Sequence, residues 1–219
     1  MSLYGRDFLS IQEWSTEELE QVLTVAADLK KKQQQGEAHP ILRGKTLGMI
    51  FQKSSTRTRV SFEVGMWQLG GQALFLSSND LQIGRGEPVK DTARVLSRYL
   101  DGIMIRTFSH AEVEELAAYA DIPVINGLTD RLHPCQAMAD LLTIREHKGS
   151  LKGLKMAYIG DGNNMVHSLM HGCAKFGMDI SVATPTAYEP NAGIVAAAKQ
   201  AAQNTGSRIE LTQDVLEAA

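Results

Sequence analysis

Short apolar runs alternate with stretches of helical periodicity along almost the whole chain, and this alternation constrains the fold more than any other feature. The apolar runs predict strands at 45–51, 72–76, 102–106, 122–126, 155–160, 179–183 and 208–211. Apolar residues at three- and four-residue spacing predict helices at 16–35, 57–69, 89–100, 110–120, 135–147, 163–176 and 192–204. Strands and helices that alternate through short connections form a mostly parallel sheet covered by helices. The predicted fold class is therefore α/β.

A glycine-bounded segment at 149–153 reads as a linker between two parts of the chain. We therefore expect two Rossmann-like parallel-sheet domains with helices on both faces, at 1–148 and 151–219. The second has only about 70 residues, which is small for an independent core. It ends in a helix-like stretch without a stop signal, so we expect this domain to be incomplete at its C-terminus.

Composition excludes several classes of protein. The net charge is −3 and the pI is about 6.1, whereas nucleic-acid-binding proteins carry a clustered basic surface. No apolar run approaches the roughly 20 residues that span a bilayer, and the first ten residues lack a signal-peptide pattern. The two cysteines imply no disulfide framework. These features predict a cytoplasmic protein without nucleic-acid or membrane partners.

The first candidate site is a hydroxyl- and arginine-rich segment between the first predicted strand of the sheet and its helix. Backbone N–H groups at a helix N-terminus are unpaired and favour an anion. Ser55, Thr56 and Thr58 add hydroxyl groups, and Arg57 and Arg59 add guanidinium groups that suit phosphate oxygens. The alternative is that the hydroxyls only cap the helix and the arginines are solvated. The segment is not a Walker loop, because the required glycines are absent.

A second group of polar residues follows later strands. Arg106 ends the strand at 102–106, and ligands of open α/β sheets bind outside the carboxyl ends of strands. His133 and Gln136 stand at the N-terminus of the next predicted helix, where they could instead be a solvated histidine and a capping amide. Donors such as Arg106 and His133 could stabilise a developing negative charge on a carbonyl oxygen. Cys135 is expected to be a small buried thiol and not a nucleophile.

Two further segments allow more than one interpretation. The polar, glycine-rich loop at 77–90, which contains Gln82, could close over a ligand or be a plain surface loop. The segment at 158–169 reads as strand, glycine turn and helix, and a dinucleotide site is the obvious rival. It lacks the third glycine of the dinucleotide fingerprint, however, and Asp161 would repel a pyrophosphate. A tight turn with a capping asparagine is the remaining alternative.

Taken together, these motifs resemble the aspartate and ornithine carbamoyltransferases. The Ser-Thr-Arg-Thr-Arg run followed by Ser-Phe-Glu at 55–63 is similar to the carbamoyl-phosphate loop of that family, and His-Pro-Cys-Gln at 133–136 is similar to a second motif. Lys53 and the Gly-Asp-Gly-Asn-Asn run at 160–164 look more like the ornithine branch than the aspartate branch. The resemblance covers nearly all of the chain. It departs at the end, since the Ser-Met-Gly loop, His-Cys-Leu-Pro segment and late arginine of the family do not occur.

The resemblance implies roles for individual residues. Carbamoyl phosphate would be bound by Ser55, Thr56, Arg57, Thr58, Gln82, Arg106, His133 and Gln136. Arg57, Arg106 and His133 would be catalytic, with Arg106 and His133 on the carbamoyl oxygen and Gln136 on the carbamoyl nitrogen. Asn164 would bind the amino-acid end of ornithine.

The implied reaction is carbamoyl transfer from carbamoyl phosphate to the δ-amine of L-ornithine, giving L-citrulline and phosphate in arginine metabolism. No metal or organic cofactor is implied. In this family the loop that contains Gln82 reaches a neighbouring active site, which implies a homotrimer or a multiple of trimers with shared sites. Three alternatives stay open: a carbamoyltransferase for another amine, a non-catalytic carbamoyl-phosphate-binding fragment, and a nucleotide-binding α/β domain.

Overall fold

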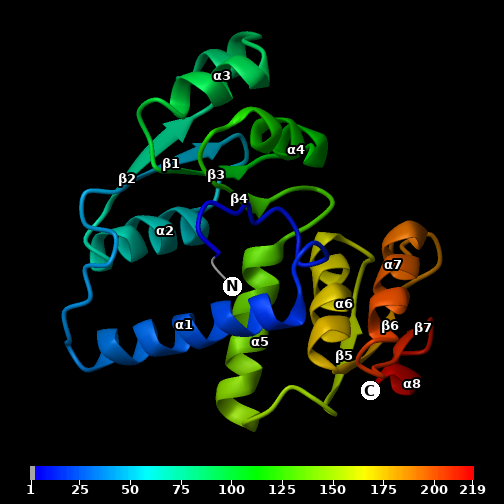
Figure 1. Cartoon of the computed structure of the whole chain (residues 1–219). Coiled ribbons are helices and arrows are strands. Elements are labelled where there is room, and N and C mark those ends of the chain that lie inside the picture. Colours follow the sequence, from blue (N-terminus) through cyan, green and yellow to red (C-terminus); the bar gives the residue numbers. More distant parts are fainter. Residues whose placement is uncertain (1–2) are drawn as a thin grey trace. The chain divides into compact units, whose positions relative to one another are not determined.

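The computed structural model describes residues 3–219 and confirms a parallel α/β fold (Figure 1). The described chain divides into two compact units, each with its own sheet. The first comprises the residues up to Leu9 and Thr24–Asp130, and the second comprises Ser10–Leu23 and Arg131–Ala219. No helix among residues 3–219 is long and apolar enough to cross a membrane.

The first unit is built on a four-stranded sheet in the order β2-β1-β3-β4, with every neighbouring pair parallel. Its strands are β1 (Thr46–Phe51), β2 (Gln72–Ser77), β3 (Gly102–Arg106) and β4 (Val124–Leu128). The helices between them are α2 (Thr56–Gln68), α3 (Val89–Leu96) and α4 (His110–Tyr119). Since consecutive strands are connected through helices and run parallel, their carboxyl ends meet at one edge of the sheet.

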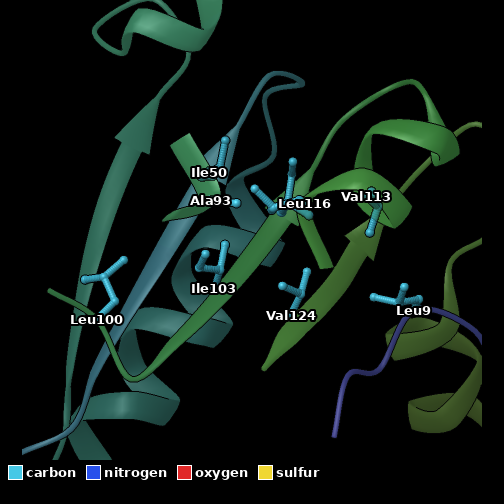
Figure 2. Packing of buried hydrophobic residues seen from close by; sticks show 9 residues of the cluster. Leu9, Ile50, Ala93, Leu100, Ile103, Val113, Leu116 and Val124 are labelled. Carbon is cyan, nitrogen blue, oxygen red and sulfur yellow. The ribbon is translucent and has the colours of Figure 1, made fainter. Parts of the chain in front are cut away.

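Side-chain alternation along the central strands produces two apolar layers, one on each face of this sheet. On β1 and β3, Ile50, Ile103 and Ile105 join the cluster that includes Ala93 of α3 and Leu116 of α4 (Figure 2). The intervening residues turn the other way: Met49 and Met104 cluster with Met66 of α2. Figure 1 shows the same division, with α3 and α4 on one side of the sheet and α2 on the other. The prediction of helices on both faces is therefore confirmed for this unit.

The second unit is built on a three-stranded parallel sheet in the order β5-β6-β7. Its elements are α5 (Pro134–Lys148), β5 (Lys155–Ile159), α6 (Asn164–Phe176), β6 (Asp179–Ala183), α7 (Ala192–Ala202), β7 (Ile209–Thr212) and α8 (Val215–Ala218). Helix α6 is its core helix, since it is buried almost continuously from Val166 to Phe176. It ends at Gly177, whose φ of +70° is the left-handed conformation that glycine adopts most easily.

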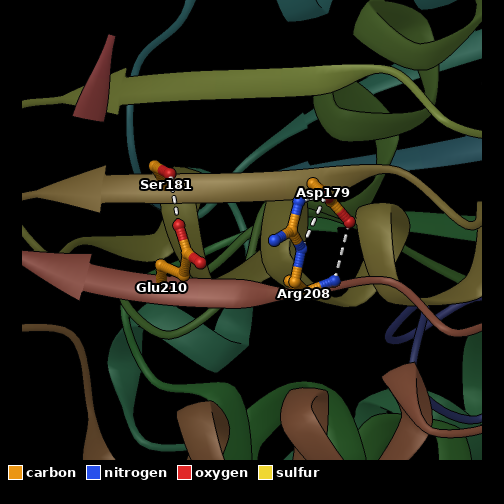
Figure 3. Close-up of polar contacts among 4 residues, drawn as sticks. All are labelled: Asp179, Ser181, Arg208 and Glu210. Atoms are coloured by element: carbon orange, nitrogen blue, oxygen red, sulfur yellow. Dashed lines mark hydrogen bonds and ion pairs between the residues drawn. The ribbon is translucent and has the colours of Figure 1, made fainter. Parts of the chain in front are cut away.

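A salt bridge joins the start of the central strand, β6, to Arg208, the residue before the edge strand β7. The Asp179 carboxylate accepts hydrogen bonds from the Arg208 backbone N–H at 2.8 Å and from its guanidinium Nε and Nη2 at 3.0 and 2.8 Å (Figure 3). These donors lower the pKa of Asp179. The ion pair connects the start of β7 to the start of β6, and so it helps to set the register between these two strands.

Helix α1 (Thr16–Gln34) begins with a capping box formed by Ser15 and Glu18. The Ser15 N–H donates to the Glu18 carboxylate at 2.8 Å, and the Glu18 N–H donates to the Ser15 hydroxyl at 3.2 Å. The first part of α1 and all of α5 belong to the second compact unit. The boundary predicted from the sequence lies later in the chain, near 148–151. The polar loop after β2 contains one short helix that was not predicted, the 3₁₀ turn η1 (Gln82–Arg85).

Candidate functional site

The turn between β1 and α2 forms an open, polar cradle at the carboxyl edge of the first sheet. Ser55 is the N-cap of α2 in extended conformation, and its hydroxyl accepts the Thr58 N–H at 3.2 Å. The same hydroxyl lies 3.0 Å from the Thr58 hydroxyl. This cap fixes the first turn of α2, whose remaining N-terminal N–H groups and dipole favour an anion.

Arg106 reaches this turn from the end of β3. Its Nη1 donates to the Thr58 hydroxyl at 3.4 Å, and its Nε is buried without a hydrogen-bond partner among residues 3–219. Burial lowers the pKa of Arg106, and the nearby charge of Arg57 lowers it further. No carboxylate in the described part of the chain forms an ion pair with either arginine. Two neighbouring guanidinium groups at a helix N-terminus therefore hold uncompensated positive charge, which suits a multivalent anion.

A cavity of about 400 Å³ lies beside the cradle, where β1 and β2 end. Its polar lining comes from Gln52, Ser54, Ser55, Thr56, Arg59, Ser77, Ser78 and Asn79. Arg59 is held at its wall by Glu63, at 3.0 Å, and by the Phe75 ring, whose centroid lies 3.8 Å from the guanidinium carbon. Neither Arg57 nor Gln82 lines this cavity; both are exposed, and Gln82 belongs to η1.

A hydrogen-bonded cluster that was not predicted from the sequence supports the cradle from behind. The Arg106 carbonyl accepts the Gln52 N–H at 2.9 Å, which ties the start of the cradle to the end of β3. The Gln52 side chain in turn bonds the Glu112 carboxylate of α4 and, at 2.9 Å, the hydroxyl of Thr107, which is fully buried. Thr107 also donates to Glu112 at 2.6 Å. The position of Thr107 directly after Arg106 was the only sequence signal for this cluster.

The second unit carries the other predicted residues. His133 is the N-cap residue of α5, and its backbone N–H donates to the Ser168 hydroxyl of α6 at 2.9 Å. Gln136, one turn later, is exposed and bonds Asp140 at 2.8 Å. Burial raises the pKa of the Cys135 thiol to about 12, so this thiol stays protonated and is a poor nucleophile.

The turn between β5 and α6 is tight and polar. Asn163 caps α6, with its side-chain oxygen accepting the Met165 N–H at 2.9 Å, and Asn164 is the first residue of the helix. Gly162 leaves no room for a side chain, since a Cβ there would lie 2.2 Å from the backbone nitrogen of Pro190. The turn is thus held against the segment before α7, and it presents Asn164 at a helix N-terminus.

A parallel α/β fold with an arginine-rich cradle at the carboxyl edge of its sheet is typical of proteins that bind a phosphorylated small molecule. Two family models match the chain: residues 6–146 match "Aspartate/ornithine carbamoyltransferase, carbamoyl-P binding domain", and residues 152–219 match "Aspartate/ornithine carbamoyltransferase, Asp/Orn binding domain". The chain belongs to the aspartate/ornithine carbamoyltransferase family.

Individual relatives are close. The chain is 62% identical over 217 residues to an ornithine carbamoyltransferase of Carboxydothermus hydrogenoformans, covering 99% of this chain and 70% of the relative. It is 64% identical over 218 residues to that of Anoxybacillus flavithermus, covering 100% of this chain and 69% of the relative. The solved ornithine carbamoyltransferase of Pyrococcus furiosus superposes with a TM-score of 0.97 at 54% identity, covering 100% of this chain and 70% of that structure.

Proposed function

We propose that this protein transfers the carbamoyl group of carbamoyl phosphate to the δ-amine of L-ornithine, giving L-citrulline and phosphate. The observation that carries the proposal is the cradle at the start of α2. There Arg57, Arg106 and the Ser55 and Thr58 hydroxyls gather around a helix N-terminus without a compensating carboxylate among residues 3–219. The close relatives named ornithine carbamoyltransferase support the choice of reaction.

The chemistry requires charge stabilisation at two places. The ornithine amine, once deprotonated, attacks the carbamoyl carbon, and a tetrahedral intermediate forms with negative charge on the former carbonyl oxygen. The carbon–oxygen bond to phosphate then breaks, the phosphate leaves with that electron pair, and the nitrogen loses its remaining extra proton. Donors at the carbonyl oxygen and at the leaving phosphate therefore lower the barrier, mainly by position and electrostatics.

We assign the residues to these tasks as follows. Arg57 and Arg106 balance the phosphate charge, and Arg106 and His133 also donate to the carbamoyl oxygen; these three are the proposed catalytic residues. Gln136 holds the carbamoyl nitrogen, and Asn164 binds the amino-acid end of ornithine. The other proposed contacts to carbamoyl phosphate come from Ser55, Thr56, Thr58 and Gln82.

The proposal extends to the organisation of the protein. Residues 1–148 would form the carbamoyl-phosphate domain and 151–219 would belong to the ornithine domain; the family models that match residues 6–146 and 152–219 support this division. The reaction would serve arginine biosynthesis in the cytoplasm. Gln82 would act in the site of a neighbouring subunit, in a homotrimer or a multiple of trimers, since it lies apart from the cavity of its own chain.

The test is a substrate screen. Purified protein is incubated with carbamoyl phosphate and L-ornithine, L-aspartate or putrescine, and each carbamoylated product is quantified. We expect citrulline alone. A larger yield of carbamoyl aspartate or carbamoyl putrescine would refute the assignment of ornithine. If no product forms while carbamoyl phosphate still raises the melting temperature, the protein binds this ligand without catalysing transfer. Stabilisation by nucleotides alone would point to a nucleotide-binding domain.

A further inference from the structure

Two consecutive residues of α6 hold the segment that carries His133. The Nδ1 atom of His167 lies 2.9 Å from the Arg131 carbonyl oxygen, and the Ser168 hydroxyl accepts the His133 N–H at 2.9 Å. Both side chains are buried, with 6% of His167 and 2% of Ser168 exposed. The segment is thus attached to α6 at two backbone atoms, one on each side of Leu132.

The hydrogen bonds of His167 determine its protonation. Its Nε2 lies 3.0 Å from the backbone N–H of Asn191, the N-cap of α7, and a backbone N–H can only donate. Nε2 must therefore carry a lone pair, which places the single proton of the neutral ring on Nδ1, where it donates to the Arg131 carbonyl. Burial lowers the pKa of His167, in agreement with a neutral ring. Both ring nitrogens are then satisfied, and the ring has no second arrangement that keeps both bonds.

These contacts arise on the same helix that begins with Asn164. His167 and Ser168 follow Asn164 by three and four residues, a spacing that places them on the same side of the helix, one turn further on. The proposed ornithine contact and the support for His133 are therefore parts of one rigid element. A helix is more rigid than a loop. Helix α6 therefore fixes the distance between Asn164 and the two side chains that support His133.

We propose that His167 and Ser168 are positioning residues that hold the backbone of residues 131–133, and so orient His133 for carbamoyl transfer. The inference rests on the function proposed above. Ser168 fixes the His133 N–H directly, and His167 fixes the Arg131 carbonyl through its Nδ1 proton. Neither side chain needs to touch a substrate. The bond of His167 to Asn191 belongs to the start of α7 and is not required for this task.

The first experiment compares two buried serines. Ser168→Ala removes the acceptor of the His133 N–H, whereas Ser181→Ala removes a hydroxyl of β6 that is equally buried, at 2% exposed, and donates to Glu210 at 3.2 Å (Figure 3). We expect Ser168→Ala to lower kcat for citrulline formation on the order of tenfold or more, because the part-buried His133 N–H loses its partner. The KM for ornithine should change little, since Asn164 stays in place, and Ser181→Ala should keep the wild-type kcat.

The second experiment separates the two nitrogens of His167. Asparagine at this position can place an amide N–H near Nδ1, toward Arg131, whereas glutamine can place an amide oxygen near Nε2, toward Asn191. We expect His167→Asn to retain most of the wild-type kcat and His167→Gln to lose as much as Ser168→Ala. This pair remains informative if Ser168→Ala folds poorly, because both variants remove the same ring. Melting temperatures are measured for all variants, and kcat is calculated per folded protein.

The outcomes are distinct. Loss of kcat in Ser168→Ala and His167→Gln, with kcat kept in Ser181→Ala and His167→Asn, supports the proposal. It is overturned if Ser168→Ala is as active as Ser181→Ala, or if His167→Gln is as active as His167→Asn. Absence of citrulline with the wild-type protein would instead refute the proposed function, together with the inference that rests on it.

Discussion

Replacement of Gly162 by alanine tests the tight turn before α6 most directly. An ideal Cβ at this position would lie 2.2 Å from the Pro190 nitrogen and 2.3 Å from the Glu189 carbonyl carbon. These are backbone atoms, so no side-chain rotation can relieve the overlap. Ordinary van der Waals contact begins at 3.4 Å, so the two segments would have to separate by about 1.2 Å.

The expected cost has two parts. Overpacking of a well-packed site costs roughly 1–3 kcal/mol. Separation of the segments would also weaken the bond from the Gly162 N–H to the Tyr188 carbonyl, which is 2.7 Å long and contributes about 1 kcal/mol. Gly162→Ala should therefore lower the free energy of unfolding by about 2–4 kcal/mol. It should also displace the N-terminus of α6, and so raise the KM for ornithine while leaving carbamoyl-phosphate binding unchanged.

Urea denaturation followed by circular dichroism measures the effect, with Gly65→Ala as the matched control. Gly65 lies within α2, and a Cβ there meets nothing within 4 Å. Alanine should therefore stabilise that helix by about 0.5–1 kcal/mol, since glycine is a poor helix former. The reasoning would be refuted if Gly162→Ala unfolded within about 0.5 kcal/mol of the wild type.

Arg57→Ala should raise the dissociation constant of carbamoyl phosphate about tenfold or more, as measured by calorimetry, because a charged hydrogen bond contributes about 1.5–3 kcal/mol; an unchanged constant would remove Arg57 from the site. Asn164→Ala should raise the KM for ornithine and leave carbamoyl-phosphate affinity unchanged, and equal losses for both ligands would contradict its assignment. Burial, together with the charges of Lys175 and Arg131, lowers the pKa of His171 from 6.5 to about 4. As the pH falls through that range, the unfolded chain takes up a proton that the folded protein does not, so the free energy of unfolding should drop by on the order of 3 kcal/mol. His171→Leu should lack this part of the acid dependence in urea denaturation at about pH 7.5 and about pH 4.5, and an identical acid dependence would show that His171 does not cause it.

Most of the fold was predictable because its signals are local. The strands are short apolar runs and the helices have clear periodicity, so α2 begins at Thr56 where 57 was predicted, and α6 begins at Asn164 where 163 was predicted. Strand order and face assignment were not predictable in this way. Met104 packs with α2 while Ile103 and Ile105 pack with α3 and α4, and this depends on which helices cover each face.

The residues of the candidate site also divide into those that local sequence signals predict and those that only tertiary contacts reveal. Ser55 and Thr58 could be singled out because a helix N-terminus rich in hydroxyls and arginines is a contiguous signal. The cluster of Gln52, Thr107 and Glu112 could not be singled out in this way. Gln52 lies 55 residues before Thr107 and 60 residues before Glu112, and Thr107 and Glu112 are 5 residues apart. Each of them alone is an ordinary polar residue, and only the parallel alignment of β1 and β3 brings the first two together.

The sequence by itself determined the class of fold, the ends of most elements, the position of the candidate anion-binding turn at 55–58 and the resemblance to one enzyme family. All of these depend on residues that are neighbours in the chain. The tertiary structure decided that Arg106 reaches Thr58 and that His167 and Ser168 hold the segment of His133. Such contacts join residues 35 to 48 positions apart, so they exist only after the strands have paired and the helices have packed.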